Sequence, residues 1–161
     1  MAVTTQYSSE YDASQISETR NLNTDEQHGR VRVAYFKHTQ SGAGDATSSA
    51  AIVRLPAGRV RLLARNSDAY VNWTTASATL DVGYDAYTDI DGTAVAASVD
   101  GIDNGVSVDT AGFQSLGSGL TATGGTKVFE SPNGVVIRVS STDTAIADGD
   151  IITGALLYVV D

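Results

Sequence analysis

Short runs of alternating apolar and polar residues recur along the chain from residue 30 onward. A period of two is typical of strands that turn one face toward a core. The first run, 30–38, places Val31, Val33 and Tyr35 on one face and Phe36 on the other. Further runs predict strands at 50–55, 59–65, 69–74, 78–84, 106–108, 127–130, 135–140 and 155–160.

Turn-forming residues separate these runs. Pro56-Ala57-Gly58 predicts a hairpin between 50–55 and 59–65, and Pro132-Asn133-Gly134 predicts a turn between the strands on either side of it. The final run is apolar at successive positions. That pattern indicates a strand that is buried on both faces or covered by a neighbouring subunit.

An acidic excursion at 85–105 interrupts the strand pattern. It contains two clusters of Asp and Gly, which are strong turn formers. Between them, 93–98 is predicted to form one short helix, with Asp91 or Thr93 as its cap. The Gly-rich pieces at 117–119 and 124–125 are interpreted as flexible connections.

About eight strands, with turns every eight to twelve residues or so, favour an all-β sandwich of the jelly-roll kind. The sequence shows no repeat with the spacing of a propeller or solenoid. The predicted β domain spans 30–161. Its aliphatic side chains are mostly Val and Ala, so association with further copies would stabilise it.

Residues 1–29 are polar and nearly free of aliphatic clusters. Such a segment does not bury enough apolar surface to order by itself. It is either a disordered tail or an extended arm that orders against a partner. In the second case Tyr7 and Tyr11 are the expected anchors.

Ten Lys and Arg against nineteen Asp and Glu give a formal net charge of -9. This balance argues against a nucleic-acid partner, because phosphate contacts need a dominant positive surface. Cysteine is absent, which removes disulfides and thiolate chemistry. No segment has the apolar length of a membrane span, and the N-terminus has no signal-peptide pattern. These features predict a protein made in the cytoplasm.

Few residues suggest catalysis or metal binding. The two histidines, His28 and His38, have no nucleophile elbow to serve. Asp89 and Asp91 form an Asp-x-Asp-Gly fragment, but the remaining calcium ligands of a full loop are missing. Trp73 is more typical of a core or an interface than of a sugar platform. We therefore expect no enzyme activity, no metal and no cofactor.

Six arginines gather in the first predicted strands of this acidic chain. They either form a solvated sheet face or meet acidic surface on a sister subunit or partner. They are Arg30, Arg32, Arg54, Arg59, Arg61 and Arg65.

Several stretches together resemble the decoration, or cement, proteins of tailed-bacteriophage capsids. The resemblance covers roughly residues 30–161. The stretches are Phe36-Lys37-His38-Thr39-Gln40-Ser41-Gly42, Val53-Arg54-Leu55-Pro56-Ala57-Gly58, Ala78-Thr79-Leu80-Asp81-Val82-Gly83-Tyr84-Asp85-Ala86-Tyr87, Asp91-Gly92-Thr93-Ala94-Val95 and Leu157-Tyr158-Val159-Val160-Asp161.

The resemblance implies a β-sandwich, often trimeric, that binds major capsid protein on the outside of the virion. Assembly in the host cytoplasm follows. The alternatives are a head-tail connector, a head fibre or a tail protein, and, less favoured, a carbohydrate-binding module. Candidate interface residues are Tyr7, Tyr11, Arg30, Arg32, Tyr87, Asp89 and Asp91.

Overall fold

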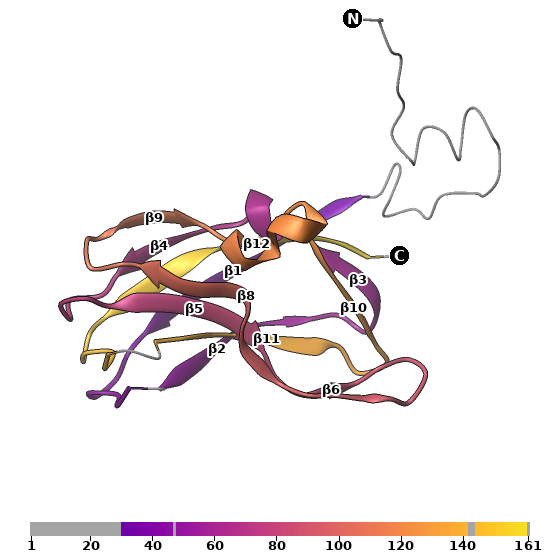
Figure 1. Ribbon diagram of the computed structural model, residues 1–161, viewed down its shortest axis with the longest axis horizontal. Coiled ribbons are helices and arrows are strands. Elements are labelled where there is room, and N and C mark those ends of the chain that lie inside the picture. Colours follow the sequence, from indigo (N-terminus) through magenta and orange to yellow (C-terminus); the bar gives the residue numbers. More distant parts are fainter. Residues whose placement is uncertain (1–29, 47, 142–143, 161) are drawn as a thin grey trace, which may run out of the picture.

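Two antiparallel sheets face each other in a β-sandwich (Figure 1). The computed structural model describes residues 30–46, 48–141 and 144–160. The larger sheet has six strands. They are β1 (Val31–Thr39), β3 (Gly58–Leu62), β4 (Asp68–Asn72), β9 (Gly112–Ser115), β10 (Lys127–Ser131) and β12 (Ile151–Val160).

Strand β12 is the centre of the larger sheet. Residues 151–159 of β12 pair with β1 on one edge. On the other edge, 151–155 pair with β4 and 158–160 pair with β3. Between β3 and β4 lies the short 3-10 helix η2 (Ala64–Asn66). Strands β10 and β9 complete the sheet beside β3 and β4.

The smaller sheet has four strands in the order β2-β11-β5-β8. Their bounds are β2 (Ser49–Leu55), β5 (Thr79–Tyr84), β8 (Ser98–Ser107) and β11 (Val135–Ser140). A separate two-stranded hairpin, β6 (Tyr87–Thr88) with β7 (Ala94–Val95), follows β5. Figure 1 shows this hairpin at the lower right.

The core lies between the two sheets, where alternate residues of each strand point inward. The larger sheet contributes Leu62, Val71, Phe129, Ile152 and Leu156, among others, and each is almost completely buried. The smaller sheet contributes Leu55, Leu80, Val82 and Ile137. The predicted all-β sandwich is therefore confirmed.

The predicted hairpin around Pro56 is wrong. Both runs are strands, but β2 pairs with β11 in one sheet and β3 pairs with β10 and β12 in the other. The turn is an arch from sheet to sheet, so that Leu55 and Val60 reach the same core from opposite sides. Turn residues alone do not distinguish an arch from a hairpin, because the strand partners are distant in sequence.

A second arch, at Pro132-Asn133-Gly134, lies against the first. It joins β10 in the larger sheet to β11 in the smaller one, which confirms the predicted turn. Gly134 has φ +74°, and a Cβ there would stand 2.2 Å from the Leu55 carbonyl oxygen. Only glycine allows the two backbones to approach this closely.

The predicted helix at 93–98 is also wrong. Thr93 ends the turn of the small hairpin, Ala94 and Val95 form β7, and β8 begins at Ser98. Six residues are too few for a helix to be stable without tertiary packing, and strand pairing with β6 prevails. Another 3-10 helix, η3 (Ser118–Thr123), lies where the Gly-rich sequence was interpreted as a flexible connection.

The described part of the chain contains twelve strands where about eight were expected. The additional ones are the short β6, β7 and β9, whose two to four residues show no clear alternation. Residues 1–29, with Tyr7 and Tyr11, lie outside the described residues. The division into an arm and a domain at residue 30 therefore stays a prediction.

Candidate functional site

The β6–β7 hairpin carries Tyr87, Asp89 and Asp91, three of the candidate interface residues, whose contact with a partner stays a prediction. Its turn is closed by backbone hydrogen bonds from Asp89 N–H to the Thr93 carbonyl (2.8 Å) and from Gly92 N–H to the Asp89 carbonyl (3.0 Å). Ile90, at the tip between the two aspartates, keeps 63% of its surface exposed. The turn therefore presents one aliphatic side chain between two carboxylates.

Both carboxylates of the turn also bond to its backbone. The Ile90 N–H donates to Asp89 Oδ1 (2.7 Å), and the Thr93 N–H donates to Asp91 Oδ1 (2.9 Å). These bonds are typical of Asp in tight turns. In the described part of the chain, no three His, Cys, Asp or Glu residues are grouped so as to hold a metal ion.

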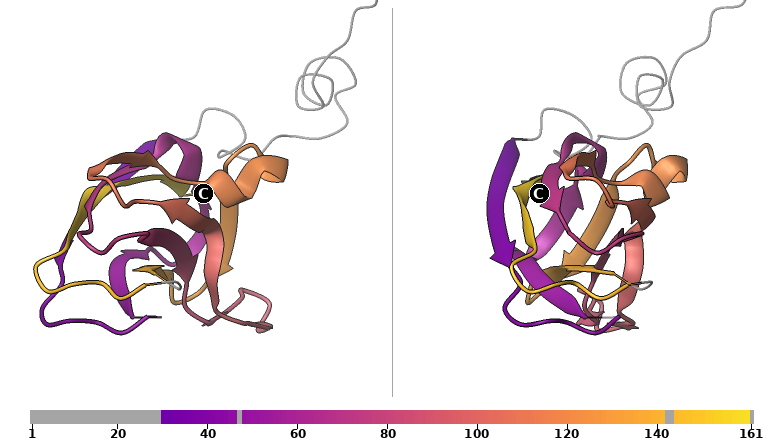
Figure 2. Two further views of the ribbon diagram at one scale, coloured as in Figure 1. Left: turned by 60° about the vertical axis from the view of Figure 1, so that its left-hand side comes forward. Right: turned by 90° about the vertical axis from the view of Figure 1, so that its left-hand side faces the viewer.

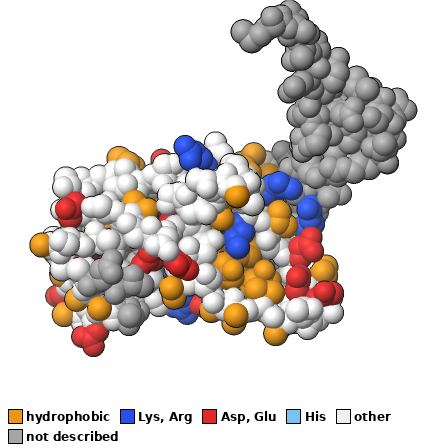
Figure 3. Space-filling view, in the orientation of Figure 1, with side chains coloured by type: hydrophobic (Ala, Val, Ile, Leu, Met, Phe, Trp, Pro, Cys, Tyr) orange, Lys and Arg blue, Asp and Glu red, His pale blue; other side chains and the backbone are white. Residues whose placement is uncertain are grey.

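An aromatic cluster supports the base of the hairpin. The rings of Tyr84, Tyr87 and Phe129 contact one another edge to face, with centroids 5.3–6.1 Å apart. The ammonium of Lys127 lies 4.8 Å from the centre of the Tyr84 ring, a cation–π distance. Burial, followed by the nearby Asp89 carboxylate, raises the pKa of Tyr87 above its usual value. Figure 3 shows hydrophobic side chains gathered on this side of the molecule, with charged groups around them.

The Asp91 carboxyl is expected to titrate below its usual pKa of 3.8, because the Thr93 N–H, and after it the Thr93 hydroxyl, favour the charged form. A lowered folded-state pKa means that the hairpin gains from this group above the usual pKa and loses that gain as the pH falls through the folded value. An NMR pH titration of the Asp91 carboxyl carbon measures this. Thr93→Val, which keeps the N–H, should move the pKa only part of the way back. Titration at or above 3.8 would contradict the capped turn.

Arg30 and Arg32 are not part of this hairpin. Both are exposed, at and just before the start of β1 in the larger sheet. Two of the other arginines contact neighbouring segments of the chain. Arg59 pairs with Glu130 at 2.8 Å, and Arg54 donates to the Asn133 carbonyl at 2.9 Å. The proposed role of Arg30 and Arg32 in a partner interface stays a prediction.

A second ion pair holds the start of the hairpin segment to the smaller sheet. Arg138 on β11 donates to Asp85, which directly follows the end of β5. This hydrogen bond raises the pKa of Arg138 further above its usual range. The polypeptide leading into β6 is thereby fixed before the hairpin begins.

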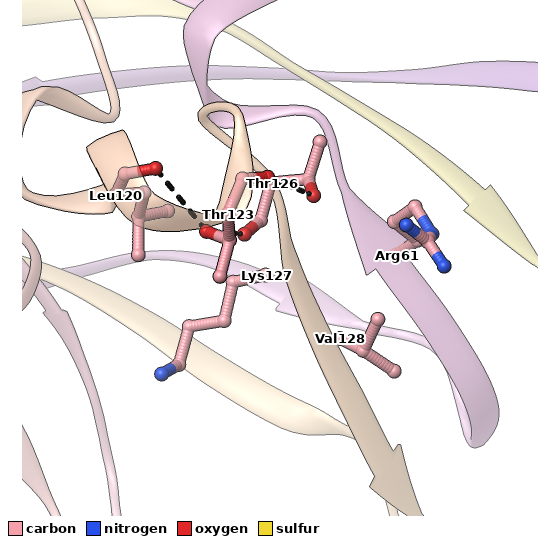
Figure 4. Close-up of a pocket in the computed structure, with 6 residues that line it drawn as sticks. All are labelled: Arg61, Leu120, Thr123, Thr126, Lys127 and Val128. Carbon is pink, nitrogen blue, oxygen red and sulfur yellow. Dashed lines mark hydrogen bonds between the residues drawn. The ribbon is translucent and has the colours of Figure 1, made fainter. Parts of the chain in front are cut away.

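A hollow of about 510 Å³ lies where η3 meets β3 and β10 (Figure 4). Its lining includes the hydroxyls of Thr123 and Thr126, which bond to nearby carbonyls: Thr123 Oγ1 lies 2.6 Å from the Thr126 oxygen, and Thr126 Oγ1 lies 3.0 Å from the Thr123 oxygen. Lys127 in the same hollow is the cation above Tyr84. These groups serve the local fold, and they do not form a nucleophile with its base.

Three buried aspartates that the sequence did not single out hold loops in place. Asp81 accepts the Gly105 N–H at 2.7 Å, and Asp103 accepts the N–H groups of Gly117 and Ser118. Asp150 accepts hydrogen bonds from Thr74 and from the Ala147 N–H.

Trp73 is 4% exposed in the core, which removes it as a sugar platform. Within the described ranges, no helix is long and apolar enough to cross a membrane.

The sequence-based site missed a second surface, on the outer face of the larger sheet. Tyr35 on β1 is 84% exposed and Phe113 on β9 is 76% exposed. Phe113 stacks edge to face on Tyr70 of β4, with ring centroids 5.3 Å apart. The signal that was available is the apolar run at 155–160, which predicted a strand that is buried on both faces or covered by a neighbouring subunit.

Comparison with known proteins gave similar solved structures but no family. No known protein-family description matches the chain, and no curated protein matches it. The structure is similar to a chain in "Cyanophage Pam1 capsid asymmetric unit", with 17% identity and a TM-score of 0.48 over 83% of this chain and 86% of that one. It is also similar to chains of infectious bursal disease virus, strains Gx and Gt, with 13% and 11% identity and TM-scores of 0.44 and 0.45. These two alignments cover 81% of this chain and 32% of each viral chain.

Proposed function

We propose that this chain is a viral structural protein without enzyme activity. In this proposal it is a decoration or cement protein on the outside of a tailed-phage capsid, where it stabilises contacts between major capsid protein subunits. The observation that carries a protein-binding role is the β6–β7 hairpin, with Ile90 exposed at its tip. The resemblance of residues 30–161 to phage decoration proteins supplies the capsid as partner.

The hairpin suits a capsid contact because it is fixed before binding. Its turn is closed by the bonds to Asp89 and Asp91, and its base packs on Phe129. A pre-organised tip loses little conformational entropy when it docks. Asp89 and Asp91 at the rim favour a basic surface on the capsid and exclude an acidic one.

The remaining contacts come from the segment that precedes β1 and from the start of β1 itself. Tyr7 and Tyr11 act as anchors of an arm that crosses between capsid subunits, and Arg30 and Arg32 bind acidic groups where that arm ends. The protein is a homo-oligomer, with a trimer expected from the resemblance. It needs no cofactor for this role and is located in the virion.

Ile90→Asp is expected to weaken binding to expanded capsids about tenfold, because a buried aliphatic anchor at an interface contributes roughly 1–2 kcal/mol. The capsids are to be assembled from purified major capsid protein of a tailed phage. Binding is measured by co-sedimentation and by the number of copies per capsid. Val99→Asp is the matched control, since Val99 on β8 is similarly exposed at 57% but lies outside the hairpin.

Absence of wild-type binding to expanded capsids would overturn the proposal. Labelling of intact particles separates the alternative virion roles. A decoration protein labels the whole head, whereas a connector labels one vertex and a tail protein labels the tail. Equal loss of binding in the Ile90 and Val99 variants would move the contact away from the hairpin.

A further inference from the structure

The outer face of the larger sheet exposes apolar side chains with a few polar residues, such as Asp68 and Thr153, among them. We call it the outer sheet face and define it by Val31, Val33, Tyr35, Tyr70, Phe113 and Leu157. The strand register brings these residues together: Val33 is opposite Leu157, Tyr35 is opposite Ala155, and Tyr70 is opposite Phe113. Figure 2 (right) shows β1, in indigo, at the outside of the molecule.

Most of this face is exposed in the described part of the chain, although Val159, opposite Val31, is only 4% exposed. The residues between those of the outer sheet face in sequence, such as Phe36, Val71 and Leu156, point to the inner face of the sheet and are buried in the core. Val31 and Val33 keep about half of their surface exposed, at 49% and 47%. A hollow of about 370 Å³ lies over the sheet, lined by Tyr35, Tyr70 and Phe113 among others. A hollow between exposed aromatic rings is a surface into which side chains of another protein copy can pack.

The apolar area reaches the lower limit for a specific contact between two copies. Aromatic side chains bury roughly 150–250 Å² each when covered, so Tyr35 and Phe113 together contribute about 300 Å². With the four other residues the face reaches about 500–600 Å², the upper range for patches on monomers. Two such faces in contact bury about 1,000–1,200 Å², which is the lower range of specific interfaces.

The charges on this face favour a second copy. The chain carries a net charge of -9, so copies repel one another over most of their surface. The outer sheet face itself carries charges of both signs: Asp68 lines the hollow beside Tyr35 and Tyr70, and Lys37 is opposite Thr153 of the same hollow. Arg61, which is opposite Val159, is a further cation at the end of the face near Val31. Lys37 and Asp68 lie on β1 and β4, on opposite sides of β12. Lys37 of one copy can therefore pair with Asp68 of the next, in a two-fold pair or in a cyclic trimer.

We propose that the outer sheet face is the interface between copies of this chain. The inference rests on the homo-oligomer of the proposed function, and it adds the surface through which the copies associate. Tyr35 and Phe113 enter the hollow region of the neighbouring copy. Lys37 and Asp68 set the register between copies.

The first test is the oligomeric mass of the full chain without capsids, by light scattering and sedimentation. The double variant Tyr35→Ser with Phe113→Ser is expected to raise the dissociation constant of the oligomer about a hundredfold. Both side chains are exposed in a single copy, so the variant should fold as the wild type does. Val99→Ser, on the other sheet, is the control and should leave the mass unchanged.

The second test exchanges the charges of Lys37 and Asp68. Lys37→Asp alone and Asp68→Lys alone should each weaken association, and the double exchange should restore it. A wild-type chain that is monomeric at the highest concentration would overturn the inference, as would a Tyr35/Phe113 variant with unchanged mass. Unchanged mass with lost capsid binding would assign this face to the capsid.

The same variants separate this inference from the proposed function. Loss of the oligomer in the Tyr35/Phe113 variant, with a wild type that binds no capsid, supports the interface and overturns the decoration role. Retention of the oligomer, with Ile90-dependent capsid binding, supports the decoration role and overturns the interface.

Discussion

Replacing Phe129 with alanine is expected to lower the free energy of unfolding by about 4 kcal/mol, because truncating a buried Phe removes apolar contacts and leaves a cavity. Phe129 is 1% exposed on β10. Its ring contacts those of Tyr84 and Tyr87, at 5.3 and 6.0 Å between centroids. The same substitution therefore also removes the support of the β6–β7 hairpin. Equilibrium urea unfolding followed by fluorescence measures the loss.

Phe129→Leu is the matched control. It keeps most of the apolar volume and should cost about 1–1.5 kcal/mol. A loss below about 1.5 kcal/mol for the alanine variant would mean that the surrounding side chains collapse into the space. In that case the aromatic cluster would not be the rigid base that the capsid proposal requires.

Replacing Asp103 with alanine is expected to cost about 3 kcal/mol, because buried N–H groups lose a charged acceptor. Asp103 is fully buried on β8. Its carboxylate accepts from Gly117 N–H at 2.8 Å, from Ser118 N–H at 2.6 Å and from the Ser118 hydroxyl at 2.5 Å. It thereby fixes the start of η3 to the smaller sheet.

Asp109→Ala is the control for the loss of a carboxylate. Asp109 is exposed and accepts one hydrogen bond, from the Ser107 hydroxyl at 3.1 Å. Its replacement should change stability by less than about 0.5 kcal/mol. Equal effects of the Asp103 and Asp109 variants in thermal unfolding would show that the buried bonds contribute little.

The strands were largely predictable because alternation is a local property of the sequence. The run at 30–38 became β1, and 135–140 became β11 with the predicted bounds. Strand partners were not predictable, since they depend on residues far away in the chain. The run before Pro56 pairs with β11, about 80 residues later, and this is why the arch was interpreted as a hairpin.

The candidate interface residues also differ in whether local sequence reveals them. Asp89 and Asp91 were recognisable because turn chemistry is local. Tyr35 and Phe113 were not, because exposure depends on which face of a strand meets the other sheet. In β1 both faces carry apolar residues, and only the position of the core decides that Phe36 is inside and Tyr35 is outside. Phe113 lies in a four-residue strand that alternation does not reveal.

The place of β12 at the centre of the larger sheet has a consequence for biosynthesis. β12 is the last strand of the described chain, yet β1, β3 and β4 all pair with it. Val31, at the start of the first strand, pairs with Val159, which is near the end of the last strand. The larger sheet therefore cannot close on a ribosome until the final strand has emerged, and such long-range pairing makes folding slow. During that interval the edges of these three strands remain open to other nascent copies, so early association is a hazard as well as a route to assembly.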